Sequence, residues 1–388
     1  GQLTPRKALY TTLRPWGRFT VGANTFGWGS GILAHDGRSA SHFGDPRRGN
    51  VVGRLSAGTR PFAGGSAAPL MVFAAGDVVI RDENAELLLG DLATQGVLGM
   101  RWSQDRLEAG VLGLVRWQRD RLDPNHPSGQ AADSLAIPLD GYVKLELRPE
   151  SAPLQADFRA EVVHIRGRTD RLWNGDTGDE GGQIQSLGAT VALSLEHADT
   201  GLELDTELAY ASGDNDPYDA VSRTFFMHSD HQLGLVLFEQ AMPLITARSV
   251  ERTSDPDLVG QAPSGLRFTE AKGGLSNAVV LNPVLIWRAT GPLELRLGWL
   301  KARSAGDFVD VYQTARSGGY NSTPGGDSPG SRDLGQEWDL GLRIAHPVSG
   351  QATLSLALEG GVFLPGAAFA GLTEEPIRTV RACAAVAW

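Results

Sequence analysis

The chain has 388 residues, of which 41% are apolar and 21% charged, and its formal net charge at pH 7 is −10. This apolar content excludes a disordered chain, and the single cysteine, Cys383, excludes a disulfide scaffold. The acidic balance argues against a nucleic-acid partner, which would require a basic face to neutralise phosphates. No window holds the roughly 18 consecutive apolar residues of a transmembrane helix, but an outer-membrane β-barrel has no such run either.

Apolar and polar residues alternate with a period of two along the whole chain, as β-strands require. Leu187, Val191 and Leu193, for example, fall on one face of a segment, and Thr190 and Ser194 fall on the other. In chain order the pattern predicts fifteen strands, at residues 6–14, 17–26, 50–61, 68–80, 91–103, 106–119, 133–148, 153–169, 183–197, 201–213, 275–289, 293–305, 333–347, 350–364 and 375–388.

Short and long connections alternate between these segments. The short ones are 14–17, 103–106, 148–153, 197–201, 289–292 and 346–350, and the long polar ones lie around 27–49, 81–91, 120–132, 170–182, 214–274, 305–332 and 364–375. Tight periplasmic turns and long extracellular loops are typical of an outer-membrane barrel. We therefore predict an all-β fold, a closed antiparallel transmembrane β-barrel of about 16–18 strands. It would form a single domain over residues 1–388, integral to a bacterial outer membrane, with a large extracellular loop at about 214–274.

Aromatic residues support this interpretation. Trp102, Trp117, Trp287, Trp299 and Trp338 take the outward parity of their strands, where an interfacial girdle belongs. The alternating segment at the end of the sequence also closes on an aromatic residue, as barrel-assembly signals do.

The strand count is odd, whereas bacterial single-chain barrels normally have an even number of strands. We expect the natural chain to continue upstream with at least one more strand. Two alternatives are a fourteen-stranded barrel, if residues 6–14 are not a strand, and a strand hidden in 225–240, where the alternation is poor.

No enzyme motif is present: the sequence lacks a Gly-x-Ser-x-Gly elbow, a phosphate loop and a His-Glu-x-x-His pair. We expect no catalysis and no cofactor. His228 and His231 could share a metal, but solvated loop histidines are the simpler interpretation. Four loop acids, Asp176, Asp179, Asp214 and Asp216, could hold Ca²⁺ on flexible backbone, yet their spacing is not that of an EF-hand. Solvated turns are the preferred alternative, so no firm metal site is predicted.

The polar parity of the strands predicts a charged lumen. The expected pore-lining and substrate-guiding residues are Arg18, Arg54, Arg101, Arg116, Arg148, Arg159, Arg296, Arg343 and Arg381, and the inward acids include Glu108, Glu161, Glu207 and Asp339. Arginine in a pore selects anions and carboxylates through charge and forked hydrogen bonds. For each of these charged residues the sequence allows two roles, structural Arg–Glu pairing or solute conduction.

Two stretches resemble the alginate-export porin family. One runs from Arg6 through Arg18 to the Gly-rich segment ending at Ala34, and the other runs from Ala209 to His231 with its Ser-Gly-Asp passage. The chain departs from the family at Gly22-Ala23-Asn24, where the family usually has Gly-Arg-Gln, so alginate itself is in doubt. The resemblance implies a monomeric barrel of about eighteen strands that releases an acidic polysaccharide, within the strand range of known barrels.

We therefore predict a conduit that exports an anionic exopolysaccharide through an Arg-lined lumen. The expected partners are the polysaccharide, outer-membrane lipid and lipopolysaccharide, and a periplasmic polysaccharide-export or scaffold protein. The alternatives are a general porin for small solutes and a non-conducting structural barrel of an envelope complex.

Overall fold

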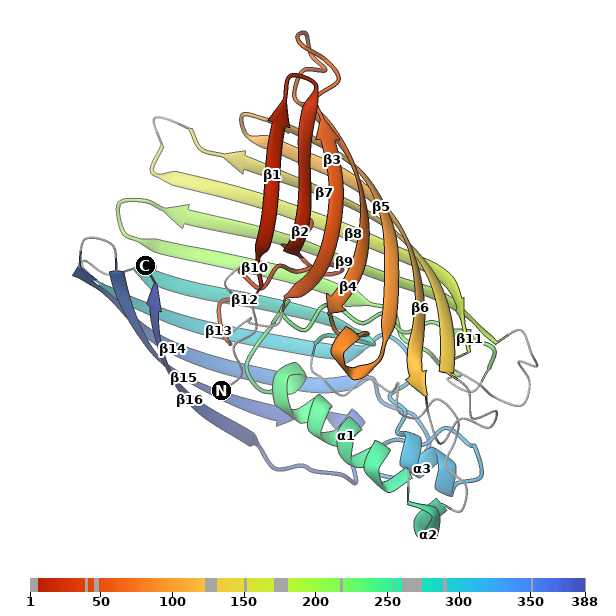
Figure 1. Cartoon of the computed structure of the whole chain (residues 1–388). Helices are drawn as coiled ribbons and strands as arrows, with labels where there is room; N and C mark the ends of the chain where they lie inside the picture. Colours follow the sequence, from red (N-terminus) through yellow and green to blue (C-terminus); the bar gives the residue numbers. More distant parts are fainter. Residues whose placement is uncertain are drawn as a thin grey trace.

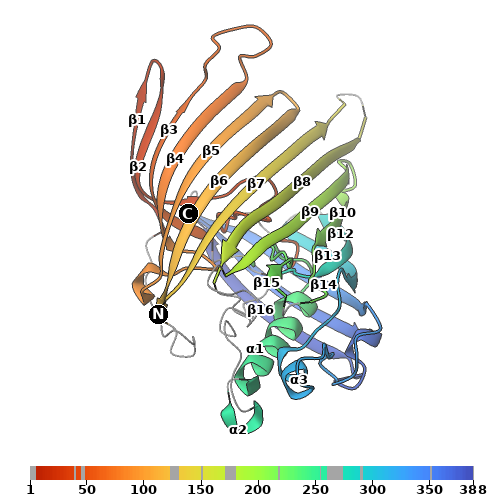
Figure 2. The ribbon, with the colours of Figure 1, turned by 90° about the vertical axis from the view of Figure 1, so that its right-hand side faces the viewer.

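The computed structural model describes residues 6–38, 41–44, 49–122, 131–149, 152–170, 181–216, 219–253, 255–259, 274–288, 292–349 and 352–387. They contain one sheet in which each wall strand pairs antiparallel with its neighbours in sequence, and the sheet curves around an interior (Figures 1 and 2). The wall strands are β1 (Ala8–Arg14), β2 (Gly17–Phe26), β3 (Asn50–Thr59), β4 (Leu70–Arg81), β5 (Leu92–Gln104), β6 (Leu107–Leu122), β7 (Ala131–Leu147), β8 (Leu154–Thr169), β9 (Gly182–His197), β10 (Leu202–Ala211), β12 (Ala278–Arg288), β13 (Leu293–Ser304), β14 (Asp333–Ser349), β15 (Ala352–Pro365) and β16 (Ile377–Ala387). The two-residue β11 (Val221–Ser222) pairs in parallel with β9, off this path.

The outer face of the wall is apolar. In β9 the side chains of Leu187, Val191 and Leu193 are exposed, whereas Thr190 and Ser194, on the opposite face, are buried. Rows of exposed leucine and valine would be unfavourable in water, but they suit a surface that meets lipid. The predicted all-β transmembrane wall is therefore confirmed.

The predicted tryptophans lie on this outer face. Trp117, Trp287 and Trp338 are 38%, 44% and 48% exposed. Indole rings in such positions suit the headgroup level of a bilayer, because their apolar body meets lipid while the N–H remains near water.

All fifteen predicted strands are present, with ends shifted by at most a few residues. No pairing between β1 and β16 occurs among the described residues, and Figure 1 shows these two strands at separate edges of the sheet. The expectation of a further upstream strand therefore stays a prediction. Residues 225–240 form no long strand. They contain an isolated bridge at Phe226 and the start of a π-helical turn, Leu237–Ala241.

The two ends of the barrel differ as predicted. Tight turns such as that between β5 and β6 lie at one end, and the helices α1 (Met242–Thr253), α2 (Pro256–Val259) and α3 (Val311–Arg316) gather at the other (Figure 2). Two 3-10 turns, Leu87–Leu89 and Ala367–Phe369, lie in connections between strands. No helix in the described ranges is both long enough and apolar enough to cross a membrane.

Part of the connection predicted as an extracellular loop at about 214–274 is buried. Residues 225–241 fold back against the inner wall, and Phe225, Val236 and Phe238 are at most 2% exposed. The reason is an apolar run that a solvated loop could not accommodate, because its burial against the wall is favourable.

Candidate functional site

Two connections enter the lumen. We call residues 27–38 and 41–44 the first inner segment and residues 225–241 the second inner segment. Ile32 and Phe43 of the first pack with Phe225, Leu235 and Phe238 of the second in one buried cluster. That cluster also includes inward residues of the wall, namely Val163, Ala209, Ala211, Ala278, Val280, Val284, Ile286, Leu300, Ala302, Leu334 and Phe363. The lumen next to these strands is therefore filled by side chains rather than by water.

Glycines on the inner wall make room for the large side chains of the inner segments. A Cβ atom at Gly298 would lie 2.6 Å from Cε2 of Phe43, and one at Gly110 would lie 2.7 Å from the indole of Trp28. Because real Cβ atoms do not approach so closely, the missing side chain is what admits each ring.

Glu337 of β14 anchors the second inner segment. Its carboxylate accepts the backbone N–H groups of Leu235 and Val236 at Oε1, at 2.5 and 2.7 Å, and that of Leu237 at Oε2, at 2.7 Å. Glu337 is fully buried, so these charge-assisted bonds are formed away from competing water. They also satisfy amides that the segment would otherwise bury unpaired.

Two of the predicted inward acids also hold the inner segments, one through backbone amides and one through a histidine side chain. Glu161 accepts the backbone N–H groups of Ser30 and Gly31, and Glu207 lies 2.7 Å from Nε2 of His231. Burial alone lowers the pKa of His231, but the charge and hydrogen bond of Glu207 outweigh it, so the pKa of this imidazole is raised. The inner segments are thus held through the acids of the wall.

The other two predicted inward acids also face the interior. Glu108 binds Arg101 and accepts a 2.8 Å hydrogen bond from the hydroxyl of Tyr142. Asp339 is buried beside Glu337, next to the anchored second segment. Both positions agree with the inward parity read from the sequence.

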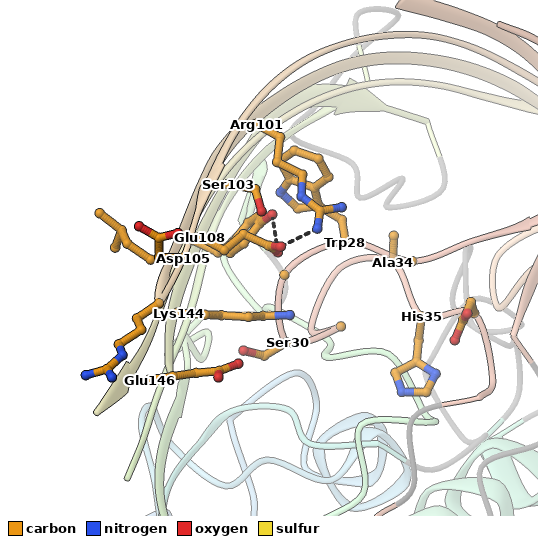
Figure 3. A pocket seen from close by; sticks show the side chains of 17 residues that line it. Trp28, Ser30, Ala34, His35, Arg101, Ser103, Asp105, Glu108, Lys144 and Glu146 are labelled. Atoms are coloured by element: carbon orange, nitrogen blue, oxygen red, sulfur yellow. Dashed lines mark hydrogen bonds and ion pairs between the residues drawn. The ribbon is translucent and has the colours of Figure 1, made fainter. Parts of the chain in front are cut away.

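A polar cavity of about 500 Å³ remains near the tight-turn end, between the first inner segment and strands β5, β6 and β7. We call this cavity the vestibule. Figure 3 shows Lys144 reaching into it, with Trp28, Ser30 and Arg101 around the same space. The Nζ atom of Lys144 lies 5.4 Å from the centroid of the Tyr142 ring, and no carboxylate within the described ranges pairs with it. The vestibule therefore offers a cation that is available to a solute.

Most of the predicted lumen arginines are bound to acids of the protein. The pairs are Arg54–Asp77, Arg101–Glu108, Arg116–Asp82, Arg148–Glu146, Arg148–Asp157, Arg159–Asp205, Arg296–Glu294 and Arg381–Glu359. Arg54 is only 8% exposed and makes two hydrogen bonds to Asp77, at 2.7 and 2.6 Å. Such pairs cross-link strands and connections.

Arg18 and Arg343 make no ion pair with any part of the chain that the structure describes. The role of these residues in guiding a solute stays a prediction.

The calcium candidates are not brought together. Asp176 and Asp179 lie outside the described residues. Asp214 accepts the N–H groups of Asp216 and Arg223, and it also pairs with the Arg223 guanidinium. Burial raises the pKa of Asp214 despite these bonds. The carboxylate of Asp214 is thus already satisfied by the protein, while Asp216 is exposed.

Several residues that matter here are not among those that the sequence predicts. Lys144 gives little signal because arginines dominate the basic residues, and Glu337 gives little because its partners are backbone amides of a distant loop. Trp28 stands in a Gly-rich run. The signal that the sequence does contain is the apolar stretch Leu233 to Phe238 inside a polar loop.

These features together define a class. An antiparallel wall with an apolar outer face, tight turns at one end and long connections at the other is an integral β-barrel of the outer membrane, as the sequence predicted.

Comparisons with known proteins leave the particular family open. No protein-family model and no curated protein matches the chain. Among solved structures, it is similar to OccK5 (OpdH) of Pseudomonas aeruginosa, with 9% identity, 97% of this chain and 79% of that chain covered, and a TM-score of 0.48. It is also similar to OccAB1 of Acinetobacter baumannii, with 8% identity, coverage of 96% and 74%, and a TM-score of 0.44. A third similar structure is the copper transporter OprC, with 13% identity, coverage of 91% and 50%, and a TM-score of 0.39.

Proposed function

We propose that the protein is a selective outer-membrane channel for small solutes that carry a carboxylate. The observation that carries this proposal is the vestibule, where the ammonium of Lys144 faces open space beside aromatic rings. A cation without a protein acid attracts an anion without first having to break an internal pair.

The filled lumen favours a small solute over a polymer. The two inner segments pack in one buried cluster with the wall, and acids of the wall anchor both of them. A polysaccharide chain could pass only after both segments had moved, whereas a small solute needs only a local rearrangement. A filled lumen therefore favours a narrow, selective channel over a general porin.

The lining of the vestibule also indicates what it would hold. Trp28 and Tyr142, which are 8% and 7% exposed, border the cavity, and the Ser30 hydroxyl lines the same space. Arg101 is shared with Glu108, so its guanidinium can assist an incoming carboxylate only in part. The other charged residues that line the vestibule are of both signs, namely Asp36, Asp105, Arg106 and Glu146, so the vestibule suits a polar solute.

Export of an anionic polysaccharide, in the manner of the alginate-export family, is the second candidate. It is supported by Arg18 and Arg343, which lie near tight turns on the inward parity and have no acid partner among the described residues. Together with Lys144 they would give the tight-turn mouth three cations without an ion-pair partner among the described residues, available to an entering polyanion. In this proposal a periplasmic export protein would dock at the same mouth.

Single-channel recording in planar bilayers distinguishes the candidates. We expect glucuronate, but not glucose, to block the current, and Lys144→Gln to weaken that block about tenfold, as the loss of one charge-assisted contact implies. Lys301→Gln is the matched control, because Lys301 is already paired with Asp333 at 2.6 Å.

Other outcomes would change the assignment. Equal block by glucose and glucuronate would overturn the carboxylate preference. Large currents blocked by polyuronate but not by neutral dextran would favour the export conduit. No current from correctly folded protein would indicate a non-conducting structural barrel.

A further inference from the structure

Three buried side chains with metal-binding atoms meet where the two inner segments cross. His35 belongs to the first inner segment, and His228 and Asp230 belong to the second. One ligand atom of each lies within 4.8 Å of the others, and Nδ1 of His35 is 3.8 Å from Oδ2 of Asp230. The three residues are only 3–4% exposed, and the imidazole centroids are 5.6 Å apart.

The donor set of the cluster suits a cation, because it combines two imidazole nitrogens and one carboxylate, all of them buried. Neutral imidazole nitrogen and carboxylate oxygen are the ligands of zinc sites, and the same set suits Cu²⁺. Oε1 of Glu83 lies 3.9 Å from Nδ1 of His228, so a second carboxylate is within reach.

Backbone amides now occupy the same lone pairs. Gly37 N–H donates to Nδ1 of His35 at 2.9 Å, Asp230 N–H donates to Nδ1 of His228 at 3.0 Å, and Gly49 N–H donates to Oδ2 of Asp230 at 2.5 Å. Bonds of about 2.1 Å in a tetrahedral site place ligand atoms roughly 3.4 Å apart. The His35–Asp230 distance of 3.8 Å is close to this value, whereas a pair at the 4.8 Å limit would have to close by about 1.4 Å. All three residues lie in connections rather than in strands, so this closure does not require a wall strand to move.

One member of the cluster also borders the vestibule. His35 is one of the vestibule's lining residues, and Figure 3 shows its imidazole on the far side of that cavity from Lys144. A cation in the vestibule would therefore meet the His35 side of the cluster first.

We propose that His35, His228 and Asp230 bind one transition-metal cation of the Zn²⁺ or Cu²⁺ type and that this ion ties the two inner segments together. The ion would act as a removable cross-link inside the lumen. Structural metal sites of this kind add their binding free energy to the stability of the segments that supply the ligands.

Electron paramagnetic resonance of Cu²⁺ added to the chelator-treated full chain in detergent micelles tests the site directly. We expect one tightly bound ion whose spectrum shows two coordinating nitrogens, and one nitrogen in His35→Gln. Added Zn²⁺ should raise the melting temperature of the wild type and of His346→Gln, the matched control, since His346 is exposed near a tight turn. The same addition should not raise the melting temperature of His35→Gln or Asp230→Asn.

Fewer than two nitrogens in the wild-type spectrum, or equal Cu²⁺ binding by the wild type and His35→Gln, would overturn the proposal. If His35→Gln fails to fold, Asp230→Asn decides: unchanged Zn²⁺ affinity in that variant counts against the site, and a loss of at least tenfold supports it. The result is independent of the transported solute, because no current is measured.

Discussion

The ring of Phe43 lies against the inner wall at Gly298, where a Cβ atom would come within 2.6 Å of Cε2 of the ring. The Phe43 ring, which belongs to the first inner segment, thus fills the space that a side chain at position 298 would otherwise occupy. Not every wall glycine has this role, because Gly96 has no heavy atom within 4 Å of its Cβ site.

Gly298→Val should displace Phe43 and detach the first inner segment. Overpacking of this kind costs about 1–3 kcal/mol. We expect a lower urea midpoint for unfolding in micelles, together with a larger single-channel current. Gly96→Val should change neither, since the added methyl groups meet open space. Equal effects of the two substitutions would contradict the seating of Phe43.

Glu337→Gln should loosen the second inner segment. The variant keeps the shape of the side chain but loses its charge, and one of its two oxygens becomes a donor facing backbone amides. Loss of such bonds in a buried site costs about 1–3 kcal/mol. We expect faster hydrogen exchange at Leu235, Val236 and Leu237 by mass spectrometry. The exposed Glu375→Gln is the control, and unchanged exchange in Glu337→Gln would rule out this anchoring.

Arg101→Glu and Arg116→Glu should have different effects, although both arginines were predicted to guide solute. Arg101 lines the vestibule, so its reversal should shift ion selectivity toward cations in reversal-potential measurements. Arg116 is bound to Asp82 and Gln118, so its reversal should weaken the connection after β4 instead. If Arg116→Glu changed the selectivity more than Arg101→Glu did, the conduction path would run past Arg116 and not through the vestibule.

Leu193→Arg should destabilise the barrel by roughly 2–4 kcal/mol if the site lies near mid-bilayer. Leu193 is 42% exposed on the outer face of β9. Leu88→Arg is the matched control, because Leu88 is 84% exposed in the connection between β4 and β5. Urea unfolding in lipid vesicles measures the difference. Equal midpoints for the two variants would show that this face of β9 does not meet lipid.

The pair of His231 and Glu207 should make the second inner segment sensitive to pH. The pKa of His231 is raised, so its stabilisation is complete below the ordinary imidazole pKa of about 6.5 and is lost as pH rises through the raised value. Hydrogen exchange over residues 225–241, corrected for intrinsic rates, should be faster at about pH 9 than at about pH 6. In His231→Gln this difference should shrink, and a full difference in that variant would assign the effect to another group.

The sequence by itself determined the wall. Alternation is a local property, because successive side chains of a strand point to opposite faces, and connection length records which end of the barrel a turn occupies. Leu193 was therefore assignable to lipid, and Glu161 and Glu207 to the interior, without any knowledge of their partners.

The tertiary structure decided how the interior is filled. Phe43 packs against Gly298, and Glu337 accepts hydrogen bonds from the amides of Leu235 to Leu237. Both contacts depend on which connections the folded wall brings next to which strands. Alternation along a strand contains no such information, since it reports the face of a residue and not what lies opposite. These contacts join residues far apart in the sequence, and they form only once the wall has curved. They bury the second inner segment, pair most of the arginines and leave the vestibule beside Lys144.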